Sequence, residues 1–366
     1  MKNVFDFDKN MASLDAKPHN LVWRSAKDKV FGIYGSDALH EKGFYRLTEA
    51  ERDLIRPVND GEAWFGEHSA GIQVRFETDS AQIFVRVKLR SAFNMTNMTQ
   101  IGQCGMDLYV YDSRLGDYAL HEVARFPFDS SSYEVPLSHF NNAERKTRRY
   151  LMYLPLYIAV DEFEIGLDED ASVRPFGFGA STRIGVYGTS ITHGCSASRP
   201  GMAYTNILSR RLDEEFLNFG FSGTAFMERE MGEILGKRKL DMLIVDTEAN
   251  AGIDERMKQN SEEFLNTFYS FNPTAPVILF SRNLLSLDLY DSYRAQMHIF
   301  YNGFLKDLAI RFRKKGFRTY FSDGSHILKG NFTERMMDGI HPDDVGMVEI
   351  ADAYEKKIKS VRKGDK

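Results

Sequence analysis

Several features that would mark common functional classes are missing from this sequence. Only 2 of its 366 residues are cysteines, and Cys104 and Cys195 have no metal-ligand spacing around them. There is no set of His, Cys, Asp and Glu with metal spacing, and no glycine-rich phosphate loop of the GxGxxG or GxxxxGK[ST] type. The sequence therefore implies neither a metal nor another cofactor, and we expect both cysteines to be structural thiols.

The chain also lacks an excess of one charge and any long apolar run. Its net charge is −5 and its isoelectric point is near 6.0, so nothing suggests a nucleic-acid partner. No stretch approaches the roughly 20 apolar residues of a membrane helix, and the opening MKNVFDFDKNMASLD has no signal-peptide core. We expect a cytoplasmic protein with no membrane partner, unless a leader was removed. Whether it forms a homo-oligomer is left open.

The hydrophobic pattern changes its period near the middle of the chain. From residue 31 to 168 apolar and polar residues mainly alternate, and AGIQVRFETDSAQIFVRVKL reads as two strands joined by a short turn. Many short strands with little helix predict a β-sandwich of jelly-roll type. The stretch 168–180 is rich in Gly, Ser and charged residues and is expected to be a linker. We therefore predict an N-terminal domain over 1–177 and a second domain over 178–366.

In the second domain, strand-like runs alternate with helical stretches. This alternation predicts a parallel sheet with helices on both faces. The expected strands are 184–187, 216–219, 242–245, 277–280 and 319–321, and the main expected helices are 203–215, 254–269, 290–314 and 343–358.

VYGTSITHG contains the best candidate for a nucleophile. Ser190 follows an apolar run that Gly188 breaks, so it is expected at the carboxyl end of a strand, where open parallel sheets bind ligands. A serine hydroxyl needs a base near neutral pKa, and that base needs a partner that fixes its tautomer. In MDGIHPDDVG, Asp338 precedes His341 by three residues and can supply both groups from one loop.

Two further segments follow apolar strands and can stabilise a developing oxyanion. The backbone N–H of Gly223 in NFGFSGTA and the side-chain amide of Asn250 in LIVDTEAN are the expected donors, together with the N–H of Ser190. A second Asp-x-x-His pair, Asp323 and His326, competes with the first. His341 is preferred because Pro342 and a long helical pattern follow it.

Three residues are candidates for substrate contact, each with a structural alternative. His193 lies on the first turn after Ser190 and is either a substrate contact or, preferably, a surface histidine. Arg199 either holds an anionic or hydroxyl-rich substrate or anchors its loop. Trp64 is either a platform for a sugar ring or a core residue.

Ser190 in GTSIT, Gly223 in GFSG, Asn250 in DTEAN and His341 in DGIHP stand in the order that resembles the SGNH superfamily of GDSL-type hydrolases. The chain departs from the usual motifs in having Thr189 in place of an aspartate and Glu-Ala-Asn in place of Gly-x-Asn-Asp. The resemblance implies a flavodoxin-like three-layer α/β/α fold. The absence of Gly-x-Ser-x-Gly argues against an α/β-hydrolase.

CGMDLYVYD carries a Gly-x-Asp-Leu-Tyr signature, which looks like the β domain that precedes certain bacterial SGNH hydrolases. Together, the motifs predict a serine esterase that removes short acyl groups, acetyl above all, from small molecules or oligosaccharides through an acyl-enzyme on Ser190. Two alternatives stay open. One is a lipase or thioesterase of the same superfamily, and the other is a carbohydrate-binding protein with a vestigial hydrolase domain.

Overall fold

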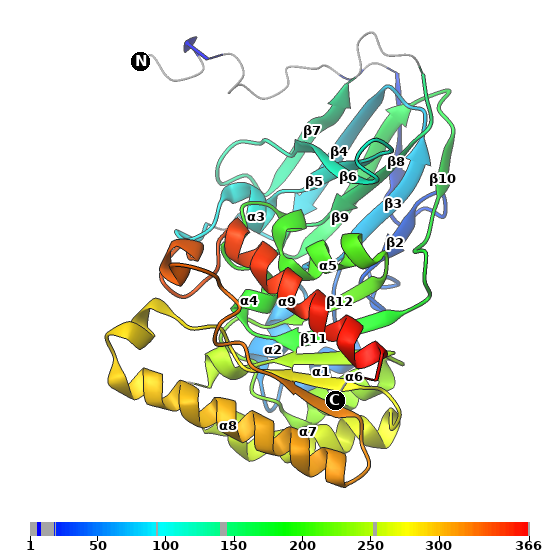
Figure 1. Cartoon of the computed structure of the whole chain (residues 1–366). Helices are drawn as coiled ribbons and strands as arrows, with labels where there is room; N and C mark the ends of the chain where they lie inside the picture. Colours follow the sequence, from blue (N-terminus) through cyan, green and yellow to red (C-terminus); the bar gives the residue numbers. More distant parts are fainter. Residues whose placement is uncertain are drawn as a thin grey trace.

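The computed structural model describes residues 6–8, 18, 20–92, 94–139, 145–251 and 255–364. Its antiparallel strands lie above a layer of parallel strands and helices in Figure 1. One antiparallel sheet has the order β1-β9-β4-β7, formed by Leu21–Ser25, Val160–Asp168, Gln82–Leu89 and Ser132–His139. The other has the order β10-β3-β8-β5-β6, formed by Val173–Pro175, Gln73–Thr78, Arg148–Tyr153, Asp107–Asp112 and Asp117–Val123, with β2 (Gly32–Tyr34) also paired to β3.

The two antiparallel sheets enclose one apolar core, which confirms the predicted β-sandwich. β3 and β4 are consecutive in sequence but belong to different sheets, so the turn between them carries the chain across the sandwich. Alternating residues of both strands point inward, and Val74, Phe76, Val85 and Val87 are all buried in the same cluster. Alternation of this kind is why the sequence pattern could be read correctly here.

Two expectations for the N-terminal half need correction. It contains the helices α1 (Glu49–Ile55), α2 (Asp60–Phe65) and α3 (Gln100–Cys104), where little helix was expected. Each is short and begins at a capping side chain, Thr48, Asn59 or Thr99. The expected linker 168–180 is also partly a strand, because β10 pairs with β3.

The C-terminal half contains a parallel sheet whose described strands follow the order β12-β11-β13-β14-β15. They are Glu215–Gly220, Arg183–Gly188, Met242–Asp246, Val277–Phe280 and Thr319–Ser322. All adjacent pairs run parallel. Numbered from β11, this order is 2-1-3-4-5, the flavodoxin-like order, which confirms the predicted fold.

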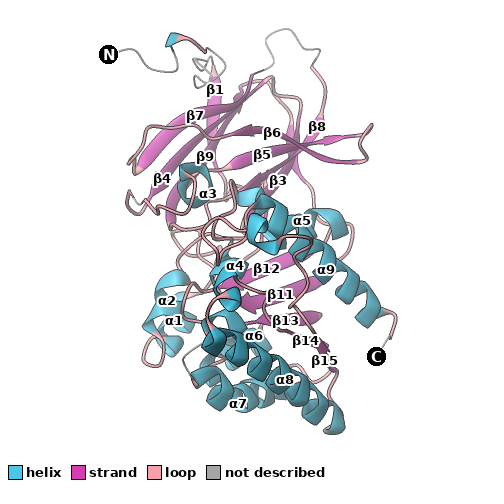
Figure 2. Cartoon of the chain, turned by 60° about the vertical axis from the view of Figure 1, so that its left-hand side comes forward, coloured by secondary structure: helices cyan, strands magenta, loops and turns pink. Residues whose placement is uncertain are grey.

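Helices cover both faces of the parallel sheet, as Figure 2 shows. α5 (Tyr204–Leu212) and α9 (Asp344–Arg362) pack with one buried cluster, and α6 (Arg229–Lys237), α7 (Arg256–Phe271) and α8 (Ser292–Lys314) pack with another. The expected helix 203–215 is too long, because Asp213 is left-handed at φ 50° and Glu215 already begins β12. α6 was not among the main helices expected, and Asp254, the expected start of α7, lies outside the described residues.

The α1–α2 segment belongs to the N-terminal half of the sequence but packs against the parallel sheet. Leu47, Ile55 and Ala63 share a buried cluster with Phe219 and other residues of the C-terminal half. The hydrophobic cores of the two halves therefore interlock. In the part of the chain that is described, no helix is long and apolar enough to cross a membrane.

Candidate active site

Ser190 lies at the point where the strand order of the parallel sheet reverses. β11 ends at Gly188, Thr189 caps the short helix α4 (Ser190–His193), and Ser190 is the first residue of that helix. Strands β12 and β13 flank β11, so the chain leaves β11 at the switch point where such sheets bind ligands. Gly188 is needed for this turn, because a Cβ there would stand 2.1 Å from Oγ1 of Thr192.

Ser190, His341 and Asp338 form a continuous hydrogen-bonded relay. Ser190 Oγ lies 2.9 Å from Nε2 of His341, and Nδ1 of His341 lies 2.8 Å from Oδ2 of Asp338. The other carboxylate oxygen of Asp338 accepts backbone N–H bonds from His341 at 2.8 Å and Ile340 at 3.1 Å. The Asp-x-x-His turn thus fixes the carboxylate, which in turn fixes the imidazole beside the serine.

The electrostatics of the relay favour a charged imidazole beside a carboxylate. Burial would raise the pKa of Asp338, but hydrogen bonds from the His341 backbone and the Asn97 side chain, together with the His341 ring, lower it to about 2. Burial would lower the pKa of His341, but Cys195 and Asp338 outweigh it and raise that pKa to about 9. The site therefore stabilises the imidazolium that forms when a serine proton is transferred.

Gly223 and Asn250 come from loops at the same edge of the sheet. Gly223 follows β12 and has φ of 73°, a conformation that favours glycine. Asn250 ends the 3₁₀ turn η4 (Glu248–Asn250) after β13. Its amide faces the backbone N–H groups of Thr224 and Ala225, so we assign the orientation in which the amide oxygen accepts from them, at 3.1 Å and 3.0 Å. These bonds tie Asn250 to the Gly223 loop. The nitrogen of the same side-chain amide is then free of this loop and available as a donor.

The candidates for substrate contact have different surroundings. The expectation of an exposed His193 is wrong: its ring is fully buried, stacks on Tyr157 at 4.0 Å and bonds to the carbonyl of Leu156 at 2.7 Å. This burial also rules out the substrate contact considered for it in this conformation. Trp64 is 50% exposed, with its ring 4.8 Å from that of Phe65.

Arg199 is part of a network that holds its own loop. Its guanidinium lies 3.8 Å from the Asp107 carboxylate and 3.7 Å from that of Asp344, and it bonds to the hydroxyl of Tyr109 at 3.3 Å. Asp107 and Tyr109 belong to the Gly-x-Asp-Leu-Tyr signature. Of the two roles considered for Arg199, the structure supports the anchoring one.

The competing Asp-x-x-His pair is not assembled as a relay. Asp323 accepts bonds from Ser325 at 2.6 Å and Asn302 at 2.8 Å, and the His326 side chain is exposed. A different histidine, which sequence reasoning missed, forms hydrogen bonds nearby. His298 bonds to Glu248 at 2.7 Å and to Ser325 at 2.9 Å.

The His298 network supports the segment that carries Asn250. Glu248 is almost fully buried, two residues before Asn250, and also accepts the backbone N–H of Arg282 at 2.9 Å. Because Ser325 donates to Asp323, its proton is not directed at His298. We therefore interpret the network as a support for η4 and not as a second nucleophilic site.

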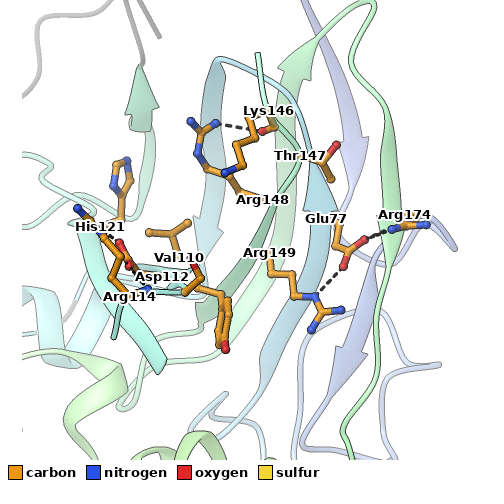
Figure 3. Close-up of a pocket in the computed structure, with 12 residues that line it drawn as sticks. Glu77, Val110, Asp112, Arg114, His121, Lys146, Thr147, Arg148, Arg149 and Arg174 are labelled. Atoms are coloured by element: carbon orange, nitrogen blue, oxygen red, sulfur yellow. Dashed lines mark hydrogen bonds and ion pairs between the residues drawn. The ribbon is translucent and has the colours of Figure 1, made fainter. Parts of the chain in front are cut away.

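A large cavity lies elsewhere, on the β-sandwich. Its volume is about 790 Å³, and its floor is formed by β3, β5 and β8. Figure 3 shows Glu77 between Arg149 and Arg174, with ion pairs of 2.7 Å and 2.5 Å. Neither Ser190 nor His341 lines this cavity.

Comparison with known proteins agrees with the motifs. Residues 181–359 match the GDSL-like Lipase/Acylhydrolase family, and residues 21–173 match the N-terminus of the Esterase_SGNH_hydro-type family. No curated protein matches the sequence.

Solved structures extend the agreement to almost the whole chain. A GDSL-like lipase from Bacteroides ovatus is 27% identical with a TM-score of 0.85, covering 94% of this chain and 98% of its own. The salicylyl-acyltransferase SsfX3 from a tetracycline biosynthetic pathway is 16% identical with a TM-score of 0.71, over 94% and 98% of the two chains. A family two carbohydrate esterase from Cellvibrio japonicus is 11% identical with a TM-score of 0.59, over 93% and 98%.

The last two likenesses concern the fold alone. The relay at the switch point of a flavodoxin-like sheet, the two family matches and the Bacteroides structure all agree. The chain belongs to the GDSL-like, SGNH-type hydrolases and carries their GxDLY N-terminal domain.

Proposed function

We propose that this protein is a serine esterase that hydrolyses short-chain esters, acetyl esters above all, on carbohydrates. The observation that carries the proposal is the Ser190–His341–Asp338 relay, whose two hydrogen bonds of 2.9 Å and 2.8 Å have the geometry of an activated nucleophile. In this assignment Ser190 is the nucleophile, His341 the general base and acid, and Asp338 its orienting partner.

The reaction follows from these roles. Ser190 Oγ forms a bond to the acyl carbon while its proton passes to Nε2 of His341. The tetrahedral oxyanion is held by the N–H groups of Ser190 and Gly223 and by the Asn250 amide. When the intermediate collapses, the bond to the alcohol breaks and His341 returns the proton to the leaving alkoxide. A water molecule, deprotonated by His341, then releases the acyl group and restores Ser190.

The preference for a short acyl group rests on the resemblance to esterases that act on acetylated sugars. Ser190 itself is 9% accessible. The sugar part of the proposal rests on analogy of fold. Two family two carbohydrate esterase structures from Clostridium thermocellum, one of them in complex with cellohexaose, have TM-scores of 0.54 and 0.53 at 13% identity.

A lipase or other acylhydrolase is the second candidate, and one observation favours it. Leu289 and Tyr290 are 54% and 85% exposed, and Met337, which precedes Asp338, is 60% exposed. The two segments meet where Ser286 N–H donates to the carbonyl of Gly339 at 2.9 Å. Exposed apolar side chains beside the catalytic loop fit the apolar tail of an ester. The third candidate, carbohydrate binding by a vestigial hydrolase, gives no reason for an assembled relay.

A chain-length series separates these candidates. Aryl esters from acetyl to decanoyl are assayed beside acetylated xylo- and gluco-oligosaccharides, with acetate release measured, for the wild type and Ser190→Ala. A short acyl pocket costs about 1 to 3 kcal/mol for each misfit group, so we expect acetate to exceed butyrate tenfold or more. A rate maximum at about eight carbons without acetate release from sugars would establish the lipase alternative. Ser190→Ala with most of its activity retained would refute the nucleophile assignment.

A further inference from the structure

The catalytic aspartate has a partner from the other half of the molecule. Asn97 lies between β4 and α3, in a loop of the β-sandwich, and its side-chain N–H donates to Oδ2 of Asp338 at 2.9 Å. This is the same oxygen that accepts Nδ1–H of His341. The contact therefore acts on the atom through which the carboxylate holds the imidazole.

The Asn97 loop is fixed against the segment that follows α4. The carbonyl of Asn97 accepts the Ser196 hydroxyl at 2.9 Å, and its amide also contacts Sγ of Cys195 at 3.6 Å. Two residues later, Thr99 Oγ1 donates to the carbonyl of Ser198. These bonds fix the backbone at Asn97 and just after it, where its side-chain N–H is directed at Asp338.

We propose that Asn97 is a positioning residue for catalysis and that the β-sandwich domain is an integral part of the active site. The inference rests on the proposed function of the Ser190 relay. Oδ1 of Asp338 is held by two backbone N–H groups, whereas Oδ2 is held only by His341 and Asn97 among the bonds of the described residues. Asn97 therefore holds the carboxylate oxygen that orients the imidazole and offsets part of its charge.

The rest of the site is also held by the N-terminal half. Arg46 is almost completely buried, and its guanidinium donates to the carbonyl of Gly220 at 2.7 Å, just before the Gly223 loop. The side chain of Asn59 donates to the carbonyl of Thr224 at 2.7 Å. Thr224 in turn donates its N–H to Asn250. These contacts independently place the N-terminal half behind the oxyanion loop, as Asn97 places it beside Asp338.

The test compares Asn97→Ala with Asn94→Ala, an exposed residue of the same loop, in the full-length protein. A hydrogen bond to a charged group is worth about 10- to 100-fold in rate, so we expect kcat of Asn97→Ala to fall by that factor with KM nearly unchanged. With one donor fewer, Asp338 becomes more basic and raises the pKa of His341. The acid limb of kcat/KM should therefore move to higher pH.

Asn97→Asp is a second test variant, in which the side chain keeps nearly the same size but loses its N–H donor. A carboxylate at this position adds negative charge beside Asp338, so the acid limb should move further than in Asn97→Ala. Among the described residues Cys195 also raises the pKa of His341, and its thiol contacts the Asn97 amide at 3.6 Å, so both Asn97 variants are compared in the Cys195→Ala background as well. Melting temperatures are measured for every variant, because a purely structural role changes stability without moving the pH profile.

The inference is overturned if Asn97→Ala has the kcat and pH midpoint of Asn94→Ala. It is equally overturned if kcat falls while the acid limb stays in place in both Asn97 variants. Ser190→Ala is assayed in parallel. If that variant stays active, the proposed function fails; if it is inactive while the Asn97 variants behave like the wild type, only the present inference fails.

Discussion

Asn250 offers the sharpest test of the oxyanion site, because its side chain has two roles that can be separated. Its oxygen holds the Gly223 loop through the N–H groups of Thr224 and Ala225, and its nitrogen is the proposed donor to the oxyanion. Asn250→Ala removes both roles. Asn250→Asp keeps the acceptor for the loop and replaces the donor with a charged oxygen.

The two variants should differ in a defined way. Loss of one oxyanion donor lowers kcat by roughly 10² to 10³, or about 3 to 4 kcal/mol, with little change in KM. Asn250→Asp should lose at least as much, since a carboxylate repels the oxyanion. Asn250→Ala should also lower the melting temperature, because two backbone N–H groups lose their acceptor at a net cost of about 1 kcal/mol each.

The assay is steady-state hydrolysis of an aryl acetate, with thermal unfolding followed in parallel. Asn331→Ala, an exposed residue far from Asn250 in sequence, is the matched control and should behave as the wild type. The reasoning is refuted if Asn250→Asp keeps kcat within about threefold of the wild type. A fall in kcat that appears only in Asn250→Ala would assign the residue to holding the loop and not to the oxyanion.

Three further outcomes are expected. His341→Ala should reduce kcat at least as much as Asn250→Ala, whereas His326→Ala should be nearly silent; the reverse pattern would exchange the two Asp-x-x-His segments. Activity needs a neutral His341, so kcat/KM should rise with pH through a midpoint above 6.5, and Cys195→Ala should lower that midpoint because Cys195 raises the pKa of His341. Burial and the nearby Glu228 hold the pKa of Glu62 well above its usual value, so the folded state retains a proton that the unfolded chain loses above about pH 4.5. Stability should therefore fall as pH rises above about 4.5, and more steeply in the wild type than in Glu62→Gln, as thermal unfolding at each pH would show.

The parallel sheet and the order of the candidate residues could be predicted because their signals are local. Each of Ser190, Gly223 and Asn250 follows an apolar run long enough for a buried strand, and parallel strands bring their carboxyl ends to one edge. The separation of His341 from His326 also had a local basis, in the proline and long helix that follow His341. The sequence pattern predicted that these residues lie at one edge of the sheet. The distances between Ser190, His341 and Asp338 could be obtained only from the structure.

The errors arose where a residue is defined by a distant partner. His193 looked like a surface residue on the first turn after the nucleophile, but Leu156 and Tyr157 of the other half cover it. α1 and α2 have only seven and six residues, too few for a helical period to emerge from the surrounding strand pattern. The capping box of α1, Thr48 with Glu51, is a local signal that the sequence reading overlooked, whereas the packing of both helices against the parallel sheet is not visible in a local window.

The Gly-x-Asp-Leu-Tyr signature is a short local motif, but two of its residues contact partners that are distant in the sequence. Asp107 is fully buried and accepts the backbone N–H of Gly201 at 2.7 Å, with Arg199 at 3.8 Å. Arg199 lies 3.7 Å from the carboxylate of Asp344, the first residue of α9. Asp344 also accepts the backbone N–H of Ser198 at 2.8 Å. α9 begins directly after the loop that carries His341. A buried carboxylate is costly unless it is hydrogen-bonded, and the bond that Oδ2 of Asp107 accepts from Gly201 forms only when the sandwich is docked on this turn. Asp107 and Tyr109 of the signature are therefore explained by contacts with the turn before α5, whereas Leu108 is explained by the sandwich core in which it is buried.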